Sequence, residues 1–561
     1  MMKLSRLNRN VRSFRRYRQI VRVLFSYGFD HLLDYLHVPP FMTRGRRFMQ
    51  RDAARMSGLT PPVRMRLALE ELGPTFVKLG QVLSTRPDII PETYAREFAA
   101  LQDQVPSFSF AEVRAQIRAE LGSNPEEIYA FIDEAPLAAA SIAQVHRARL
   151  MTGEEVVIKV RRPDVVSVVE SDIDALMVIA ALAERHLEES RLYDPIGIVR
   201  EFARVIRREM DFSREGHTIE KMAENFGNDR TLHFPRVFWE QTSHGILTME
   251  YIDGIKVSDL KALRRAGIDL VAVARNGADA FLKMVLEHGF FHGDPHPGNV
   301  LILPDNVICL LDYGMVGRVD PEVKSLLVDL LVAVIHRDMD EVVSILLYSG
   351  DIAEPFDARR LKRDLGEFID GYYEIPLKDI EVGRMVAEFL EIITTYHIKF
   401  QPDLMLMAKA LMTVEGMGRT LDPEFDMIGH LRPFVERAIT QRVTPRTVTR
   451  DLRSITNAYL GMVKNLPRDL KTLINRINHD KFKIDLEHRG LDQFTRELDK
   501  SINRLSSSLI MAALIVGSSL IMQTNKGPQM FGFPAFGFLG YTIAGMLGLW
   551  WVFAIIRSGR L

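Results

Sequence analysis

Cysteine is nearly absent from this sequence: its 561 residues include one, Cys309. A single cysteine excludes an internal disulfide, which fits a reducing compartment. Because Cys309 lies in the apolar run 307–311, we expect a buried strand residue and not a reactive thiol. The formal net charge is −1 and the pI about 7.0, so the whole chain carries no nucleic-acid signal. Internal repeats and low-complexity stretches are also missing, and the length predicts two or more domains.

Acidic residues are missing from the first 29 positions, where basic and apolar residues recur at roughly helical spacing. The basic residues are Lys3, Arg6, Arg9, Arg12, Arg15, Arg16, Arg18 and Arg22. The apolar residues are Leu4, Leu7, Val11, Phe14 and Val21. The segment lacks the apolar core of a secretory signal. Over residues 1–49 we therefore predict a basic amphipathic segment suited to an anionic membrane surface, with a solvated basic tail as the alternative.

Charge is missing again from two apolar runs near the C-terminus, 505–522 and 533–556. Each is near the ~20 residues that cross a bilayer as a helix. Arg504 precedes the first run, and Arg557 and Arg560 follow the second, so the positive-inside rule places both ends in the cytoplasm. We predict two transmembrane helices over 505–557, preceded by a juxtamembrane helical region over 441–504.

Small residues recur four apart in both runs: Ala513 with Gly517, and Ala544 with Gly548. Such pairs let helices approach closely, so they would pack the hairpin on itself or join two copies as a homodimer. A buried soluble hairpin is the alternative for this region.

Between these ends, the pattern predicts a small strand-rich lobe followed by a larger helical lobe. Residues 50–130 form a helical extension, 131–253 the strand-rich lobe with a helical insert at 165–225, and 254–440 the helical lobe. The expected strands are 142–149, 156–160, 234–239, 246–252, 300–303 and 307–311. After Asp320, an expected N-cap followed by Pro321, we expect helices alone up to the hairpin.

Side chains suited to ATP chemistry gather in the run 292–299, His-Gly-Asp-Pro-His-Pro-Gly-Asn, and in Asp312-Tyr313-Gly314. The order matches that of protein kinases: a catalytic aspartate (Asp294), an asparagine for Mg²⁺ (Asn299), a short hairpin, and an aspartate for Mg²⁺ (Asp312). Upstream, Lys159 in an apolar strand matches the lysine that grips the α- and β-phosphates. Taken alone, Lys159 is equally explained as a strand lysine whose head reaches water.

Three features of ordinary protein kinases are missing. No Gly-x-Gly-x-x-Gly precedes Lys159, and the equivalent turn reads Ala138-Ala139-Ala140-Ser141. Gly293 replaces the arginine of His-Arg-Asp, and only 315–319 separate Gly314 from the next helix cap. The pattern therefore favours the kinase fold but argues against phosphorylation of proteins.

These motifs resemble the UbiB (ADCK) family of atypical kinases, linked to ubiquinone biosynthesis. Three further segments match that family. They are Lys78-Leu79-Gly80-Gln81 with 84–88, the alanine run Ala138 to Ser141 with 144–146, and Glu209-Met210-Asp211 with Glu215 downstream. The C-terminal apolar pair also resembles the anchor of bacterial members.

The resemblance implies binding and hydrolysis of Mg-ATP, with Lys78 and Gln81 lying over the site and excluding protein substrates. It implies that Lys159 pairs with an acid of the helical insert, for which Glu215 is the candidate. Glu209 and Asp211 would instead meet Lys78, unless all three acids form a solvated helix face. The expected nucleotide-binding residues are Ala138, Ala139, Ala140, Ser141, Lys159, Glu250, Lys78 and Gln81. The expected catalytic residues are Asp294, Lys159 and Glu215.

The prediction is thus an α+β, two-lobed kinase-like fold with an N-terminal helical extension and a C-terminal transmembrane hairpin. We expect an atypical kinase or ATPase of the inner membrane, with its kinase-like domain in the cytoplasm, that supports ubiquinone biosynthesis. Expected partners are polyprenyl-phenol or quinone-precursor lipids, the membrane and enzymes of that pathway, without nucleic acid. The alternatives are a small-molecule or lipid phosphotransferase and a nucleotide-binding scaffold. A ring hydroxylase finds no support, since the sequence has no dinucleotide fingerprint.

Overall fold

A computed structural model of the chain divides into two compact units, residues 1–449 and 450–561, and each is described by itself. The residues described are 15–29, 58–86, 89–101, 105–186, 194–227, 229–335, 338–349, 351–352, 357–373, 375, 380–396, 398–442, 491–524, 528–530 and 533–558.

The N-terminal basic segment is described from residue 15, and residues 15–26 are helical. Its apolar face is buried inside the first unit: Ile20 and Val21 are each 2% exposed and join the main hydrophobic core. Arg16 forms an ion pair with Asp172, 2.5 Å long, while Arg15, Arg18 and Arg22 are exposed. The prediction of an apolar face available to a membrane is wrong for this stretch, because the protein covers that face. Residues 1–14 lie outside the described residues.

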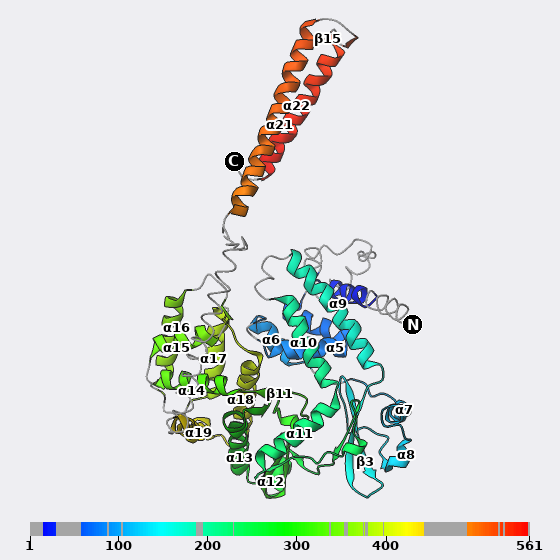
Figure 1. Cartoon of the computed structure of the whole chain (residues 1–561), viewed down its shortest axis with the longest axis vertical. Helices are drawn as coiled ribbons and strands as arrows, with labels where there is room; N and C mark the ends of the chain where they lie inside the picture. The colour runs from blue at the N-terminus through cyan, green and yellow to red at the C-terminus, as the bar shows by residue number, and fades with distance from the viewer. Residues whose placement is uncertain are drawn as a thin grey trace, which may run out of the picture. The chain divides into compact units, whose positions relative to one another are not determined.

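The expected helical extension is present as separate helices, of which α5 carries the Lys78 motif (Figure 1). The helices are α4 (Pro61–Leu72), α5 (Pro74–Ser84), α6 (Glu92–Ala99), α7 (Phe110–Leu121) and α8 (Pro125–Ile128). Proline at the first turn suits α4 and α5, because that N–H would have no partner in the helix. Gly73, at φ 97°, separates these two helices. A Ser109–Glu112 capping box starts α7.

The strand-rich lobe is an antiparallel sheet in the order β1-β3-β4-β6, with β2 paired to β3. Its strands are β1 (Tyr129–Ile132), β2 (Ala138–Ala139), β3 (Ala143–Leu150), β4 (Glu155–Arg161) and β6 (Ile246–Glu250). The expected strand at 234–239 is wrong: the segment makes one isolated bridge, Val237 to Met249, and Pro235 cannot donate to a ladder. The central strand β4 carries Lys159 between Val145 of β3 and Leu247 of β6.

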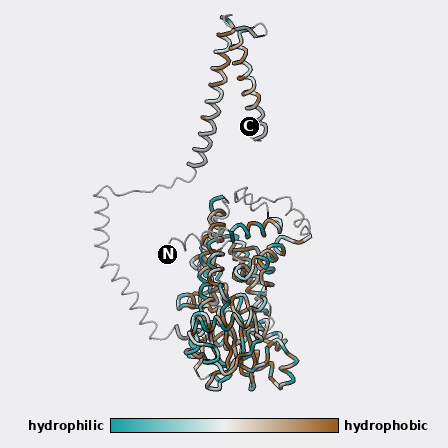
Figure 2. The backbone as a smooth tube through the Cα atoms, turned by 90° about the vertical axis from the view of Figure 1, so that its right-hand side faces the viewer, coloured by the Kyte–Doolittle hydropathy of each residue, from teal (hydrophilic) through white to brown (hydrophobic). Residues whose placement is uncertain are grey.

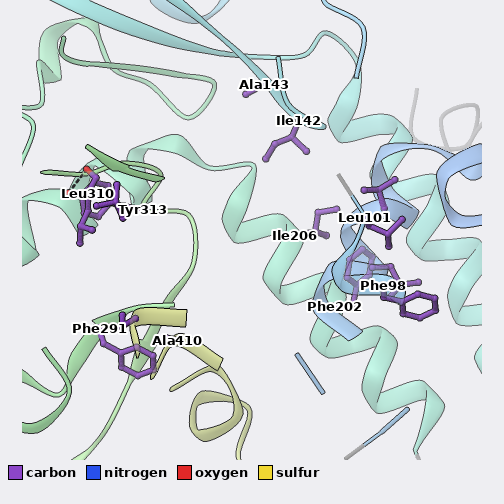
Figure 3. Close-up of a cluster of buried hydrophobic side chains, with 14 of the residues drawn as sticks. Phe98, Leu101, Ile142, Ala143, Phe202, Ile206, Phe291, Leu310, Tyr313 and Ala410 are labelled. Atoms are coloured by element: carbon purple, nitrogen blue, oxygen red, sulfur yellow. Dashed lines mark hydrogen bonds between the residues drawn. The ribbon is translucent and has the colours of Figure 1, made fainter. Parts of the chain in front are cut away.

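The helical insert between β4 and β6 packs against this lobe and against the extension. It consists of α9 (Val165–His186), α10 (Pro195–Glu209) and α11 (Phe212–Phe226). Phe202 and Ile206 of α10 are fully buried, and Figure 3 shows them beside Phe98 and Leu101 of the extension. This packing ties the Lys78 helix and the insert into one core.

The second lobe begins with a small sheet in the order β5-β10-β9-β7 and a separate β8–β11 pair. The strands are β5 (Leu232–His233), β7 (Ile255–Lys256), β8 (Phe290–His292), β9 (Val300–Leu303), β10 (Val307–Leu310) and β11 (Val316–Arg318). The hairpin β9–β10 matches the expected one and turns through Pro304–Asn306. Cys309 in β10 is fully buried, as expected, and burial raises the pKa of its thiol to about 12.

Helices make up most of this lobe. They are α12 (Leu260–Arg265), α13 (Leu270–Leu282), a π-helical turn (Lys283–His288), α14 (Pro321–Ile335), α15 (Met339–Ser349), α16 (Ala358–Tyr373), α17 (Val382–Thr395), α18 (Pro402–Leu421) and α19 (Met427–Arg442). Asp320 caps α14 as expected, accepting from the Val323 N–H at 2.8 Å. The expectation of helices alone is wrong at one place, since β12 (Asp351–Ile352) pairs with β13 (Ile398–Lys399).

The second unit contains two helices in contact, α21 (Leu491–Thr524) and α22 (Ala535–Ser558). Between them, β14 (Gln529–Met530) pairs with β15 (Phe533–Pro534). Figure 2 shows hydrophobic stretches along the described parts of both helices. By length and hydropathy, Leu505–Gln523 qualifies as a candidate membrane span among the described residues, while Ala535–Leu549 is a shorter apolar helix. The second span therefore remains a prediction.

Candidate nucleotide-binding site

Lys159 lies at the centre of the candidate site. Its ammonium is 2.9 Å from both carboxylate oxygens of Glu215 and 3.3 Å from Asp312 Oδ1. The Phe212 ring, at the start of the same helix as Glu215, lies 5.3 Å from Nζ. Burial opposes the charge, but the carboxylates of Asp312 and Glu215 raise the pKa of Lys159. The lysine is therefore held as a cation, with its head away from bulk water.

Glu215 is buried at 5% exposed and has a second contact, accepting from the Tyr313 N–H at 3.2 Å. Burial raises the pKa of Glu215, and Lys159 opposes that rise. The expected Lys159–Glu215 pair is present, and the solvated-face alternative is wrong for Glu215. By joining β4, α11 and the Asp312 turn, Glu215 positions both lysine and aspartate.

Asp312 follows β10 in a left-handed conformation, φ 51°. Its Oδ1 accepts from the Gly314 N–H at 3.3 Å, and Lys159 lowers its pKa, so it is ionised near neutral pH. Tyr313 is buried in the core, and its hydroxyl donates to the Leu310 carbonyl at 2.9 Å (Figure 3). The buried ring thus anchors the turn, while the Asp312 side chain stays 55% exposed.

The loop after β8 is tied to the Asp312 turn by His292. Its Nε2 lies 3.2 Å from the Leu311 carbonyl and 3.0 Å from the Asp312 carbonyl, and its Nδ1 accepts from the Asp294 N–H at 3.2 Å. Burial lowers the pKa of His292, which favours the neutral ring that this arrangement needs. His292 therefore bonds the loop to the Asp312 turn.

Asp294 and Asn299 lie on this loop. The Asn299 amide donates to the Asp294 carbonyl at 3.4 Å, and the Leu311 N–H donates to the Asn299 carbonyl at 2.8 Å. The second bond sets Asn299 beside the residue that precedes Asp312. The Asp294 carboxylate is 30% exposed and lies 3.6 Å from Lys409 Nζ.

The alanine-rich segment is a tight hairpin and not a free turn. Ala138 and Ala139 form β2, and the Ala140 N–H donates to the Ala143 carbonyl at 2.8 Å. Ser141 is 1% exposed, and its hydroxyl has no hydrogen-bond partner among the described residues. A buried hydroxyl without a partner is unusual in proteins, and a phosphate oxygen that reached this hairpin would satisfy it.

Lys78 forms an ion pair with Glu209 at 2.5 Å, and both side chains are largely buried. A Cβ on Gly314 would lie 3.7 Å from Glu209 Cγ, so this pair borders the Asp312 turn. Of the two acids proposed for Lys78, Glu209 is therefore correct. Asp211 is wrong, since it bonds His244 at 2.8 Å instead.

Two other expected nucleotide-binding residues have protein partners. Gln81 donates to the Leu101 carbonyl at 3.2 Å. Glu250, at the end of β6, accepts from His233 Nε2 at 3.0 Å and from the Arg236 N–H at 3.1 Å. The structure does not bring either into contact with Lys159.

The donor set fits Mg-ATP. Among the described residues, no cluster of three His, Cys, Asp or Glu side chains is arranged to hold a metal. Magnesium in phosphotransfer sites commonly uses one or two protein oxygens together with phosphates and water, which Asp312 and Asn299 can supply. Lys159 and Ser141 would hold phosphate oxygens, and the metal would neutralise phosphate charge.

Sequence reasoning missed Lys409, which α18 brings to Asp294. It also missed Arg161, which donates to the Met210 carbonyl at 2.9 Å and pairs with Glu120 at 2.8 Å. Arg161 thereby supports the turn between Glu209 and Glu215. Neither residue belongs to a motif, so no local signal identified them.

Comparison with known proteins identifies the family. Residues 100–346 match the ABC1 atypical kinase-like domain, 365–426 the UbiB helical domain, and 489–557 the ABC1/UbiB kinase-like C-terminal domain. The "Probable protein kinase UbiB" of Pseudomonas paraeruginosa is 33% identical over 93% of this chain and 97% of its own length. The chain belongs to the ABC1/UbiB family of atypical kinase-like proteins. Its two-lobed architecture is accordingly kinase-like.

Other similarities are broad or weak. An uncharacterized protein in the hydrogenase 1 5′ region of Clostridium pasteurianum is 30% identical over 97% of this chain and 99% of its own length. A solved Rv3197–erythromycin complex from Mycobacterium tuberculosis is 20% identical and covers 61% of this chain and 87% of that one. Its TM-score of 0.41 is too low to support an argument.

Proposed function

We propose that this ABC1/UbiB protein is a membrane-anchored ATPase or atypical kinase that binds Mg-ATP and supports ubiquinone biosynthesis. The observation that carries the proposal is the convergence of Glu215 and Asp312 on Lys159, within 3.3 Å. Kinase-like sites need such a lysine–acid pair and a metal-binding aspartate in place at the same time. The role in ubiquinone biosynthesis rests on family membership.

Each residue then has a defined task. Lys159 and Ser141 bind phosphate oxygens, while Asp312 and Asn299 provide oxygens for Mg²⁺. Asp294 orients a water molecule, whose oxygen bonds to the terminal phosphorus as the bond from that phosphorus to the bridging oxygen breaks. ADP leaves with the electron pair, and the proton of the water passes through Asp294 to solvent.

Protein phosphorylation is the outcome least supported by this geometry. The Lys78–Glu209 pair borders the Asp312 turn, and β11 begins two residues after Gly314. That leaves no activation segment to hold a peptide. A lipid or small-molecule phosphotransferase is the second candidate, because the partly exposed Asp294 carboxylate can equally accept a proton from a substrate hydroxyl.

Membrane anchoring is supported by the second unit. Leu505–Gln523 is long and apolar enough to span a bilayer, and exposed Leu505 and Leu509 lie on it. We propose that the hairpin anchors the protein in an inner membrane, with both ends of the hairpin in the cytoplasm. We propose lipid quinone precursors as the partners of the protein in that membrane.

Hydrolysis by the purified full chain in lipid nanodiscs tests the site. We expect Asp312→Asn to lower ADP release about 100-fold or more, because the carboxylate that would hold Mg²⁺ against the phosphates is lost. Lys362→Met, which breaks an exposed pair with Asp340, serves as the matched control. Thermal unfolding checks that wild type and Asp312→Asn are both folded. Equal rates of ATP hydrolysis by the two folded proteins would refute the assignment of Asp312 to the site.

Two further measurements separate the alternatives. A phosphorylated product from a polyprenyl phenol would favour the phosphotransferase. Normal quinone levels in a deletion strain rescued by Asp312→Asn would favour a scaffold that needs no catalysis.

A further inference from the structure

Lys409 brings a third lysine to the site from a helix that holds none of the motifs. It lies on α18, and its Nζ is 3.6 Å from Asp294 Oδ1. The two side chains are 35% and 30% exposed, so both meet solvent. Among the described residues, Asp294 provides the carboxylate that lies within 4 Å of the Lys409 ammonium.

Gly293 explains how α18 comes so close to the loop. A Cβ at this position would lie 2.6 Å from Leu406 Cδ2 and within 3.1 Å of two further Leu406 atoms. Leu406 precedes Lys409 by three positions, which places both on one helix face. Figure 3 shows Ala410, fully buried, beside Phe291 of β8. Glycine in place of the usual arginine therefore leaves room for the Leu406 side chain, which lies three positions before Lys409 on α18.

The other two lysines already have close carboxylate contacts. Lys159 meets Glu215 and Asp312 within 3.3 Å, and Lys78 meets Glu209 at 2.5 Å. Lys409 has one carboxylate beyond hydrogen-bond distance, and an ammonium group carries three donors. A partly exposed pair of this kind is held weakly, so its lysine can exchange one anion for another.

We propose that Lys409 binds the terminal phosphate of Mg-ATP, and that it pairs with Asp294 when that phosphate is absent. This inference rests on the proposed function, and it extends the site to a residue of the helical lobe. The ligand chemistry is the terminal phosphoryl group of a nucleoside triphosphate, which carries charge that ADP lacks at that position. Lys409 would thus distinguish substrate from product.

Nucleotide titrations of the full chain test the proposal. Binding of Mg-ATP, through a non-hydrolysed analogue, and of Mg-ADP is measured for wild type, Lys409→Met, Lys409→Arg and the control Lys362→Met. We expect Lys409→Met to weaken triphosphate binding about tenfold or more, because a charge-assisted hydrogen bond is lost. ADP binding should stay within about twofold of wild type, and Lys409→Arg should keep most of the triphosphate affinity.

A second pair of variants tests the packing. Gly293→Ala should reduce the preference for triphosphate over ADP by displacing α18, and adding Leu406→Ala should restore it. The proposal is overturned if Lys409→Met changes the binding of both nucleotides equally or of neither. An intact preference in Gly293→Ala would overturn the packing role of Gly293. Wild type that binds neither nucleotide would instead overturn the proposed function, and this proposal with it.

Discussion

The two lobes present lysine–carboxylate contacts of different kinds. On the strand-rich side, Lys159 is 14% exposed and Glu215 5%, and their contacts are 2.9 Å long. On the helical side, Lys409 and Asp294 are about one-third exposed and 3.6 Å apart. A buried pair cannot lose one partner without leaving an uncompensated charge, whereas a hydrated pair can. We infer that Lys159 keeps Glu215 as its partner when nucleotide binds, and that Lys409 is free to exchange Asp294 for substrate.

Removing Lys159 should have the largest effect. Lys159→Met leaves Glu215 charged and buried, so we expect the free energy of unfolding to fall by about 3–5 kcal/mol. Nucleotide hydrolysis should also be lost. Urea unfolding monitored by circular dichroism measures the first effect, and ADP release measures the second.

The double variant Lys159→Met with Glu215→Met separates the contribution of Lys159 to stability from its contribution to nucleotide hydrolysis. Two apolar groups of similar length should recover much of the stability, because no buried unpaired charge remains and Asp312 is 55% exposed, but none of the activity. If Lys409→Met destabilised the protein as much as Lys159→Met does, the contrast between the two sides would be wrong.

The Arg16–Asp172 pair lies away from the site and shows whether burial of an ion pair alone has a large effect on the free energy of unfolding. Asp172 is 1% exposed, and Arg16 also donates to the Leu72 carbonyl at 2.6 Å. We expect Arg16→Ala to cost about 2–3 kcal/mol, because a buried carboxylate loses its charged donor. Hydrogen exchange should rise in residues 15–26 while hydrolysis persists.

Arg18→Ala is the matched control, since Arg18 is exposed on the same helix. Exchange that rises equally in both variants would mean that the Arg16–Asp172 contact does not hold the helix in place.

The smallest effect should come from pH, at a pair outside the site. Asp229 lies 2.7 Å from Lys283, and although burial opposes its charge, Lys283 and Thr231 lower its pKa. The unfolded value is about 3.9, so the stabilisation is fully present above that pH and is lost as pH falls through the lower folded value. The difference in unfolding free energy between wild type and Lys283→Met should therefore be constant near neutral pH and shrink below about pH 4.

Lys221→Met, which breaks an exposed pair with Glu224, should show no such dependence. A difference that grew as the pH fell would contradict the sign of the Asp229 shift.

Much of the site was predictable because its groups lie in short, ordered motifs. Asp294, Asn299 and Asp312 share one loop–hairpin–loop stretch, so their spacing limits where they can lie. The partner of Lys78 was not predictable: Glu209 and Asp211 are two residues apart, and the end of α10 between them determines which one faces α5. The expected strand at 234–239 failed because apolar residues predicted a ladder that Pro235 interrupts.

The N-terminal segment shows the same limit. Its basic and apolar periodicity described an amphipathic helix, and residues 15–26 are one. Periodicity gives no information on what covers the apolar face, and here the core of the first unit covers it.

By itself, the sequence determined the order of lobes, the candidate side chains for phosphate and Mg²⁺ and the short segment after Gly314, because each depends on motifs of residues close along the chain. Only the tertiary structure decided that Glu209 and not Asp211 meets Lys78, that Gly293 admits Leu406, and that Lys409 reaches Asp294. Those contacts join residues far apart in the sequence, and packing between helices sets which of many similar lysines and acids meet.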